Sequence, residues 1–472
     1  MKRIIVVLGL CVLAACGGSG NSGPEPVQRN AGINVLLITV DTLRADHLSA
    51  YGYPRNTSPR IDELAGKGVL FETAFTYWPK TRGSFAALFT GLYASQHGLT
   101  VRNRDLPDFN QTLAETFQEA GYRTGAALDN GNLDQALGFA QGFETYEQTW
   151  LTGETELERT EAITDFGLDY LSATDDERPF FLWLHYVNPH TPYDPPEALL
   201  SQFRGDGVIP RGPELEIVTG YHGGLNRHLA VDGETHWGDY VDRYDAEILA
   251  VDAHVGRVLD ALAASPHAEE TLIVFTSDHG ESLGEHDYFF DHGFDLFNPS
   301  LRIPLIASFP GFLPAGERIH GTVSTLDVYP TILDLAQLSF PTGRAELQGK
   351  SLLPLVRGTT SRLHPHIFFQ NDQHLMAITN GRLKLVRYPD TKDRGAQFRL
   401  LDMYRDPAEL ENRYEGSEAR IAPFEAQLSS FRTQTVAWQQ ATDTKRAGPS
   451  TEDEELPEQT RRSLESLGYI EK

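Results

Sequence analysis

The sequence predicts an α/β fold: a large, mostly parallel sheet sandwiched by helices, with a smaller C-terminal α+β subdomain. Two observations lead to this prediction. Short apolar runs rich in β-branched residues alternate with helical segments, which is the pattern of parallel strands buried between two helix layers. Beyond about Gly349 the runs become shorter and the alternation stops, which indicates a second unit. A chain of 472 residues is long enough for both.

The first half of the chain contains apolar runs that end in polar or ionisable residues. Residues 34–41 form such a run and end in Asp41, so we predict a buried strand there. Ser58 precedes Pro59, which predicts the N-cap and the first position of a helix that continues through Leu64. Further predicted elements are a helix over 111–120 and strands over 122–128 and 179–187.

The second half repeats the pattern and then changes. A long amphipathic stretch over 244–262 predicts a helix, and it leads into a predicted strand over 271–280 that closes on ionisable residues. A strand over 302–309 and a helix over 329–338 follow. In the smaller unit we predict strands over 366–369, 383–387 and 398–403 and a helix over 421–431.

Composition divides the chain into predicted segments. These are a lipoprotein signal peptide over 1–16, a linker over 17–31, a catalytic α/β domain over 32–348, a C-terminal α+β subdomain over 349–440 and a polar tail over 441–472. Within the tail, residues 441–459 are polar and acidic with little to bury, so we expect a mobile arm there.

The N-terminus resembles a bacterial lipoprotein signal. Lys2 and Arg3 precede a short apolar run, and Leu13-Ala14-Ala15-Cys16 follows it. Cleavage would make Cys16 the first residue and the site of a lipid that attaches the protein to a membrane. The apolar run is too short to span a bilayer, and a plain signal peptide is the alternative. We therefore expect a lipid-anchored protein of the bacterial cell envelope, periplasmic or surface-exposed. Its mature fold would have neither disulfides nor a catalytic cysteine, because Cys11 lies in the removed segment.

The charge balance argues against nucleic acid as a partner. Lys and Arg number 40 against 66 Asp and Glu, the formal net charge is −26, and no basic cluster stands out. Binding to nucleic acid depends on such clusters, so we expect that the protein does not bind nucleic acid.

A hydroxyl group stands directly before a helix of small residues. Thr81 is followed by Gly83, Ser84, Ala86 and Ala87, which permit close approach of a ligand to the backbone, and helical N–H groups beginning near Gly83 would face an anion held over Thr81. A Thr hydroxyl becomes a useful nucleophile only beside a cation or a base. The alternative is that Thr81 merely caps the helix.

Ionisable residues elsewhere could supply that cation. Asp41, Asp278 and His279 lie at the ends of predicted strands, where open α/β folds keep their sites. Together with Thr81 they make a credible site for one divalent ion, and carboxylate and imidazole ligands admit Ca²⁺, Mg²⁺, Mn²⁺ or Zn²⁺. His190 and His292 are candidates to contact the transferred group or to protonate the leaving oxygen. Each residue also has a plain structural alternative, such as a helix cap, a turn or a surface histidine.

A series of short motifs runs in order from Asn34 to Asn412. They comprise Asn34 to Asp41 with Tyr51-Gly52, Leu88 to Tyr93 with His97-Gly98, Pro189 to Tyr193, Ser277 to Glu281 with Leu283 to His286, Leu301 to Ile306, Asp327 to Thr331, and Leu401 to Tyr404 through Asn412. As a set these motifs resemble the sulfatase family within the alkaline phosphatase superfamily. The resemblance implies the fold of that family, one tightly held metal ion and hydrolysis of an ester.

The nucleophile region departs from that family's pattern. Sulfatases carry a Cys or Ser that is converted to formylglycine, and Thr81 stands in this register, where it cannot be matured in that way. Gly83 and Phe85 replace the Pro and Arg of the motif. A register that uses Ser84 lacks the same Pro and Arg.

Other departures concern the groups that bind the substrate. The family's sulfate-binding Lys and His are missing at Leu128 to Gly131, Thr42 replaces the second acid of the first metal strand, and His292 replaces a later Lys. Tyr186 stands where two-zinc phosphodiesterases carry an extra Asp, so the resemblance implies one metal ion rather than two.

These departures favour phosphoryl chemistry, because relatives with a Thr nucleophile act on phosphate esters. The sequence therefore predicts a metal-dependent hydrolase of a phosphate monoester or diester, or of a related ester, with a small-molecule, glycan or lipid substrate. A sulfuric ester hydrolase is the alternative. A surface binding protein that kept the fold and lost catalysis is a third possibility, whereas phosphoethanolamine transferases carry membrane helices that this sequence lacks.

Overall fold

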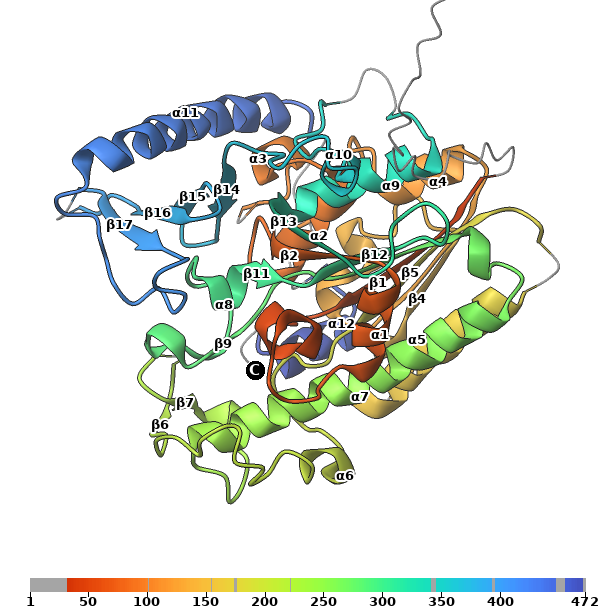
Figure 1. The fold of residues 1–472 in the computed structure, drawn as a ribbon, viewed down its shortest axis with the longest axis horizontal. Coiled ribbons are helices and arrows are strands. Elements are labelled where there is room, and N and C mark those ends of the chain that lie inside the picture. Colours follow the sequence, from red (N-terminus) through yellow and green to blue (C-terminus); the bar gives the residue numbers. More distant parts are fainter. Residues whose placement is uncertain are drawn as a thin grey trace, which may run out of the picture. The chain divides into compact units, whose positions relative to one another are not determined.

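A mixed nine-stranded sheet forms the centre of the fold in this computed structural model (Figure 1). The structure describes residues 32–100, 102–153, 155–173, 176–220, 222–340, 345–392, 395–446 and 455–469. The predicted signal peptide and linker, and with them Cys16, lie outside the described residues.

Five neighbouring strands of the large sheet are parallel, in the order β8-β1-β5-β3-β4. On the other side of β8, β12 is antiparallel to both of its neighbours, β8 and β2, and β13 runs parallel to β2. The predicted large and mostly parallel sheet is thus confirmed. The strands are β1 Asn34–Val40, β2 Val69–Phe75, β3 Arg123–Leu128, β4 Thr145–Gln148, β5 Phe180–Tyr186, β8 Thr271–Ser277, β11 Arg302–Ile303, β12 Leu305–Ser308 and β13 Glu317–Ser324.

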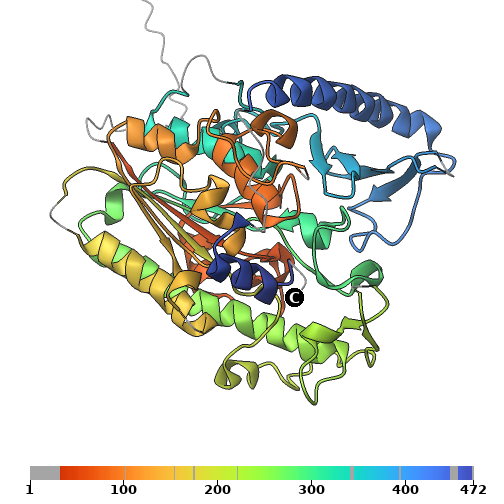
Figure 2. The same ribbon diagram turned by 180° about the vertical axis from the view of Figure 1, so that it is seen from behind.

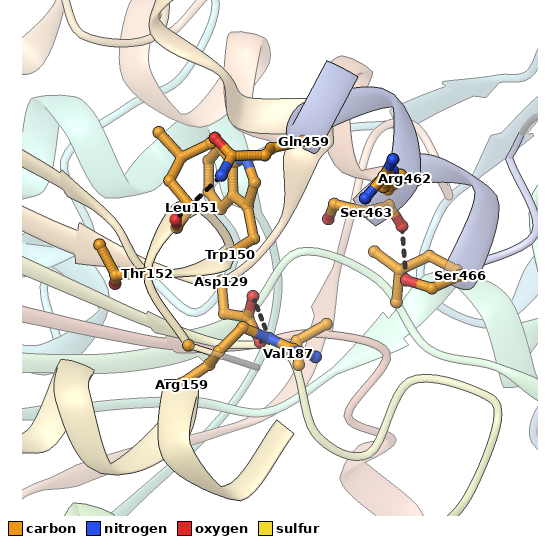
Figure 3. A pocket seen from close by; sticks show the side chains of 12 residues that line it. Asp129, Trp150, Leu151, Thr152, Arg159, Val187, Gln459, Arg462, Ser463 and Ser466 are labelled. Atoms are coloured by element: carbon orange, nitrogen blue, oxygen red, sulfur yellow. Dashed lines mark hydrogen bonds and ion pairs between the residues drawn. The ribbon is translucent and has the colours of Figure 1, made fainter. Parts of the chain in front are cut away.

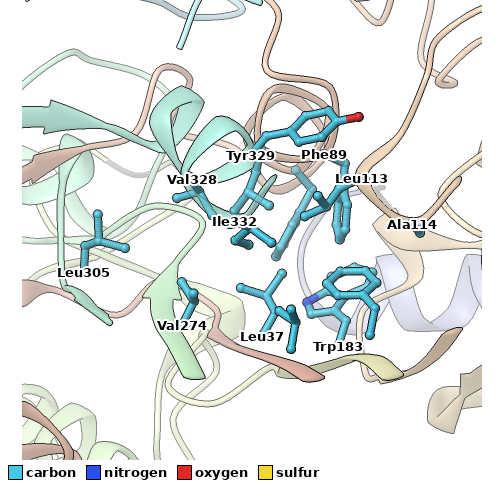
Figure 4. Close-up of a cluster of buried hydrophobic side chains, with 14 of the residues drawn as sticks. Leu37, Phe89, Leu113, Ala114, Trp183, Val274, Leu305, Val328, Tyr329 and Ile332 are labelled. Carbon is cyan, nitrogen blue, oxygen red and sulfur yellow. The ribbon is translucent and has the colours of Figure 1, made fainter. Parts of the chain in front are cut away.

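Helices cover both faces of this sheet (Figures 1 and 2). Successive side chains of β1 point to opposite faces: Leu37 joins one buried cluster and Leu36 the other. The Leu37 side packs against α2 Thr81–Thr90, α4 Leu113–Glu119 and α9 Val328–Ala336 (Figure 4). The Leu36 side packs against α1 Pro59–Lys67, α5 Glu156–Ser172 and α7 Trp237–Ala264. Burial on both faces explains why these strands are continuously apolar.

The C-terminal unit is an antiparallel sheet in the order β14-β15-β16-β17, covered by one long helix. Its elements are β14 Ile367–Gln370, β15 Met376–Thr379, β16 Leu383–Tyr388, β17 Gln397–Asp402 and α11 Glu418–Asp443. Ile378 and Leu385 of the sheet pack against Ile421 and Leu428 of α11. The predicted α+β subdomain is confirmed, with a helix that extends well beyond the predicted 421–431.

Short elements occupy the loops. They are α3 Ala94–His97, α6 Glu197–Leu200, α8 Asn298–Leu301, α10 Leu353–Val356, β6 Ile217–Val218, β7 Leu225–Asn226, β9 Ser282–Leu283 and β10 Phe289–Asp291, and two 3₁₀ turns that bear on the site, η3 Gly131–Leu133 and η5 Thr149–Leu151.

The predicted polar tail over 441–472 holds an ordered helix beyond the segment expected to be a mobile arm. Residues 455–469 contain a helix, α12 Glu458–Ser466, on which Thr460 and Leu464 are fully buried. Leu456, just before the helix, is also buried, and Thr460 and Leu464 form one stripe of the helix while its remaining residues are polar. Average composition does not reveal such a narrow stripe.

None of the helices in the described ranges combines the length and apolar character that crossing a bilayer requires.

Candidate active site

Three neighbouring parallel strands end together and bring the predicted residues to one edge of the sheet. Val40 at the end of β1 pairs with Ser277 of β8 on one side and with Tyr186 of β5 on the other. Asp41 and Asp278, each the next residue, therefore leave the sheet side by side, and the backbone N–H of Asp41 donates to the carbonyl of Tyr186 at 2.9 Å. The expectation that these segments meet at the carboxyl edge is met.

Asp41, Asp278 and His279 form a buried group with the geometry of a cation site. Their potential ligand atoms all lie within 4.8 Å of one another, and all three side chains are fully buried. Oδ1 of Asp41 and Oδ2 of Asp278 have no hydrogen-bond partner. The Nδ1 atom of His279 lies 2.9 Å from the Gly280 carbonyl, to which it can donate, and this leaves the lone pair of Nε2 facing the carboxylates. Buried, unsatisfied carboxylate oxygens beside an imidazole nitrogen fit a divalent cation.

The electrostatics of this group point the same way. Burial and the adjacent charge of Asp41 raise the pKa of Asp278 well above its ordinary value. Burial opposes ionisation of Asp41 too, but His185 and the other nearby histidines outweigh it and lower the pKa of Asp41 to about 2. Burial lowers the pKa of His279 to about 4, so its ring is neutral and can act as a ligand. Two carboxylates this close are difficult to keep ionised without a cation between them.

Two residues that the sequence analysis did not single out hold Asp41 in place. The side-chain amide of Asn130, after β3, donates to Oδ2 of Asp41 at 2.6 Å, and Nε2 of His185 on β5 lies 3.5 Å from the same oxygen. Both side chains are fully buried. Asn130 lies in the segment Leu128 to Gly131, where the sulfate-binding Lys and His of the family are missing. Nothing in the local sequence pattern indicated that its side chain contacts Asp41.

Thr81 begins α2 beside this group. Its side chain is almost fully buried, and its Oγ1 lies 3.4 Å from Nε2 of His279. Residue 80 is the N-cap and makes no side-chain cap, so the alternative that Thr81 caps the helix does not apply. The hydroxyl of Ser84 donates to the carbonyl of Asp278 at 2.7 Å, which fastens the first turn of α2 to the end of β8.

The interpretation of Gly83 needs correction. We expected its missing side chain to leave room for a ligand, but a Cβ at this position would lie 2.7 Å from Cγ of Trp78. The indole ring therefore occupies the space above Gly83. The residue is small because Trp78 packs on it.

His190 and His292 converge on a point next to Thr81. Their ring centroids are 5.1 Å apart, and those of His292 and His279 are 4.1 Å apart. Nδ1 of His190 lies 2.6 Å from the Thr191 carbonyl, and Nδ1 of His292 lies 3.3 Å from Oε1 of Glu281. The Nε2 atoms of both rings therefore face the site. Burial lowers the pKa of His292 well below its ordinary value.

The phenol oxygen of Tyr469 occupies the point on which these groups converge. It lies 3.1 Å from Oγ1 of Thr81 and 3.1 Å from the Nε2 atoms of both His190 and His292. The sequence analysis missed this residue because it belongs to the segment described only as a polar tail. The burial stripe of α12 is the one sequence signal that could have found it.

Two pockets lie on either side of Tyr469. The first, of about 250 Å³, reaches Thr81 and is also lined by Trp78, Lys80, Arg82 and Arg104. The second, of about 290 Å³, reaches His292 and includes His222, His228 and Asp291. Tyr469 lines both pockets, so each opens beside the point on which Thr81, His190 and His292 converge.

Comparisons with known proteins agree with this fold. The sulfatase family model matches residues 33–338, and a model of the C-terminal region of N-sulphoglucosamine sulphohydrolase matches residues 284–434. An arylsulfatase of Clostridium perfringens is 26% identical over 450 residues, which cover 80% of this chain and 89% of the relative.

Solved structures share the fold. A 2-O GAG sulfatase superposes with a TM-score of 0.69 at 24% identity and covers 90% of this chain and 96% of its own. A phosphonate monoester hydrolase of Agrobacterium radiobacter also gives 0.69, at 23% identity, with 85% and 96% covered.

The α/β fold and the buried Asp, Asp and His group next to a hydroxyl define a hydrolase that acts on ester bonds, of the sulfatase type. Because the family model covers more than half of the chain, the chain belongs to the sulfatase family.

Proposed function

We propose that this protein is a metal-dependent hydrolase of phosphate monoesters or diesters, or of related esters, in which Thr81 is the nucleophile. The observation that carries the proposal is the position of the Thr81 hydroxyl, 3.4 Å from the imidazole nitrogen of His279 in a buried Asp, Asp and His group. A hydroxyl in this position can attack phosphorus directly and form a covalent intermediate.

Asp41, Asp278, His279 and Thr81 would hold one divalent ion. When bound, such an ion lowers the pKa of the Thr81 hydroxyl and neutralises charge on the transferred group. Asn130 and His185 keep the Asp41 carboxylate oriented, because they lie against its second oxygen. The complete burial of the ligands excludes water and strengthens each of these interactions.

The two histidines supply the proton transfers. As the bond from Thr81 Oγ1 to phosphorus forms, Nε2 of His190 or His292 takes the proton of the Thr81 hydroxyl and passes it to the alcohol oxygen, whose bond to phosphorus breaks. In the second step, water attacks the phosphoryl-Thr81 ester and gives a proton to the imidazole, which passes it to Oγ1 of Thr81 as the bond from that oxygen to phosphorus breaks. The orientation of both rings supports these roles, since their Nε2 atoms face the same point.

Hydrolysis of a sulfuric ester is the second candidate, and the comparisons favour it. The family model, the arylsulfatase relative and the GAG sulfatase are all named for sulfate chemistry. Residue 81 favours the first candidate, because a threonine cannot become the formylglycine on which sulfatases depend. A non-catalytic surface binding protein remains the third candidate.

Parallel assays separate these candidates. Purified protein beginning at Asn30 is supplied with Zn²⁺, Mn²⁺, Mg²⁺ or Ca²⁺ and offered an aryl sulfate, a phosphate monoester, a phosphodiester and a phosphonate monoester. We expect turnover of at least one phosphorus ester. Turnover of the sulfate alone would establish the second candidate, and a protein that binds no divalent ion would favour the third.

Substitution of the nucleophile tests the mechanism. Thr81→Ala should lower kcat by about 10³-fold or more, whereas Thr81→Ser should retain activity. Thr90→Ala is the matched control, since Thr90 is buried at the other end of α2 and its hydroxyl donates to the carbonyl of Ala86. A Thr81→Ala protein as fast as wild type would refute the mechanism.

A further inference from the structure

The C-terminal segment places one oxygen atom at the centre of the site. The phenol oxygen of Tyr469 lies 3.1 Å from Oγ1 of Thr81, from Nε2 of His190 and from Nε2 of His292. Residues from α2, from the turn after β5 and from the loop after β10 therefore converge on a residue near the end of the described chain.

The segment that delivers Tyr469 is fastened to the fold by several contacts. The hydroxyl of Thr460 donates to Oδ2 of Asp134 at 2.5 Å, and the indole N–H of Trp150 donates to Thr460 at 3.3 Å. The backbone N–H of Gly131 donates to the hydroxyl of Ser463 at 3.2 Å. Buried polar contacts of this kind are characteristic of a built-in element rather than of a loosely attached tail.

Close approach of α12 to η3 also depends on the lack of a side chain at Gly131. A Cβ there would lie 3.0 Å from the carbonyl oxygen of Thr460 and 3.1 Å from Oγ of Ser463. On the same helix, the side-chain amide of Gln459 donates to the carbonyl of Leu151 in η5 at 3.4 Å (Figure 3). The helix is thus held from η3 and from η5 together.

A tight end to the helix then directs the tyrosine inward. The backbone N–H of Tyr469 donates to the carbonyl of Leu464 at 2.8 Å, and the side chain of Leu464 is fully buried in the main core. The position of the phenol therefore follows from the docking of α12.

The side chains of Thr81, His190, His292 and Tyr469 have hydrogen-bonding groups that could bind an additional oxygen ligand. A phenol carries a single proton, so it can donate to only one imidazole at a time. A tetrahedral anion beside Thr81 would present several acceptor oxygens, to which the phenol O–H can donate. The pockets on either side of the ring leave room for the rest of the substrate.

We propose that Tyr469 is a catalytic residue that donates a hydrogen bond to an oxygen of the group transferred to Thr81. The proposal rests on the function proposed above and assigns the C-terminal helix to the active site: α12 serves to present this hydroxyl. The ligand class that it fits is a tetrahedral oxyanion, phosphoryl or sulfuryl.

Tyr469→Phe tests the proposal, because it removes the hydroxyl and keeps the ring. In the metal-supplied full-length protein, kcat should fall about 10²-fold, which is typical for loss of one donor to a developing charge. Tyr329→Phe is the matched control: Tyr329 on α9 is also buried, its hydroxyl lies 2.6 Å from that of Thr116 on α4, and the kcat of this variant should equal that of wild type.

Binding of inorganic phosphate provides a readout that does not depend on turnover. Calorimetric titration of the Mn²⁺-supplied protein with phosphate, and in parallel with sulfate, should show about tenfold weaker binding for Tyr469→Phe than for wild type. Weaker binding in a protein that hydrolyses no ester would leave this inference standing while the proposed function fails.

Three results would overturn the inference. Equal kcat and equal phosphate affinity in wild type and Tyr469→Phe would show that the hydroxyl is not used. A higher kcat or tighter phosphate binding in Tyr469→Phe would show instead that the tyrosine blocks the site. A wild type that neither binds these anions nor turns over any ester would overturn the inference and the proposed function together.

Discussion

Removal of the Asn130 side chain tests how Asp41 is prepared for a cation. Of the two oxygens of Asp41, Oδ1 has no hydrogen-bond partner and Oδ2 accepts from Asn130 at 2.6 Å, with His185 farther away at 3.5 Å. Asn130→Ala therefore deletes the shorter of the two contacts. The amide oxygen of Asn130 also accepts from the backbone N–H of Asn132 at 2.9 Å, so the substitution loosens η3 as well.

The expected loss can be estimated from the role of Asn130. Residues that orient a metal ligand typically contribute 10- to 100-fold to affinity, which corresponds to about 1.4–2.7 kcal/mol. We expect a decrease in Mn²⁺ or Zn²⁺ affinity within this range. Competition with a chromophoric chelator measures the affinity, and thermal unfolding of the metal-free protein measures the stability.

Asn110→Ala separates orientation from simple destabilisation. Asn110 is also buried, and its amide donates to two backbone carbonyls, those of His97 and Pro107 at 2.8 and 2.9 Å. Both variants should lose about 1–3 kcal/mol of stability, because each leaves buried groups unsatisfied. Only Asn130→Ala should lose metal affinity. Equal metal affinity in the two variants would refute the reasoning.

Three further predictions follow from other parts of the molecule. Burial and the charge of Asp41 raise the pKa of Asp278, so at any pH below that pKa a cation must displace the Asp278 proton in order to bind. Metal affinity, measured by chelator competition, should therefore fall about tenfold for each unit by which the pH decreases. An affinity that does not depend on pH would contradict this prediction. Gly83→Ala should cost about 1–3 kcal/mol in denaturant unfolding, because the new Cβ meets Trp78 at 2.7 Å, whereas Gly66→Ala in α1, with open space around it, should be neutral or stabilising. We also propose the lipid anchor at Cys16: Cys16→Ser should move the protein from the membrane fraction to the soluble fraction of a cell lysate, and an unchanged distribution would exclude the anchor.

The sequence alone determined the class of fold and the grouping of three buried residues that could hold a cation. Continuous apolar runs such as 34–41 and 271–280 predict strands buried on both faces, and the ends of parallel strands meet at one edge whatever the details of packing. That geometric necessity is why Asp41, Asp278 and His279 could be grouped although 237 positions of the chain, from 41 to 278, separate the two acids.

Elements whose sequence signal was weak or shared with other structures were missed. Strand β2 is interrupted by polar residues over Glu72-Thr73, and the buried face of α5 contains only two large apolar residues, Ile163 and Leu171. The antiparallel direction of β12 could not be predicted either. Hydrophobic periodicity indicates which face of the sheet a side chain points to, but not the direction in which the strand runs.

Tertiary structure alone decided what surrounds Thr81. Asn130, His185 and Tyr469 reach Asp41 and Thr81 from segments that are remote in sequence, and each contact depends on how one element docks on another. The polar tail docks through the buried residues Leu456, Thr460 and Leu464. Composition does not predict this docking, because the average polarity of the tail conceals its few buried side chains. Local patterns determine where strands end, whereas only long-range packing determines which side chains meet there.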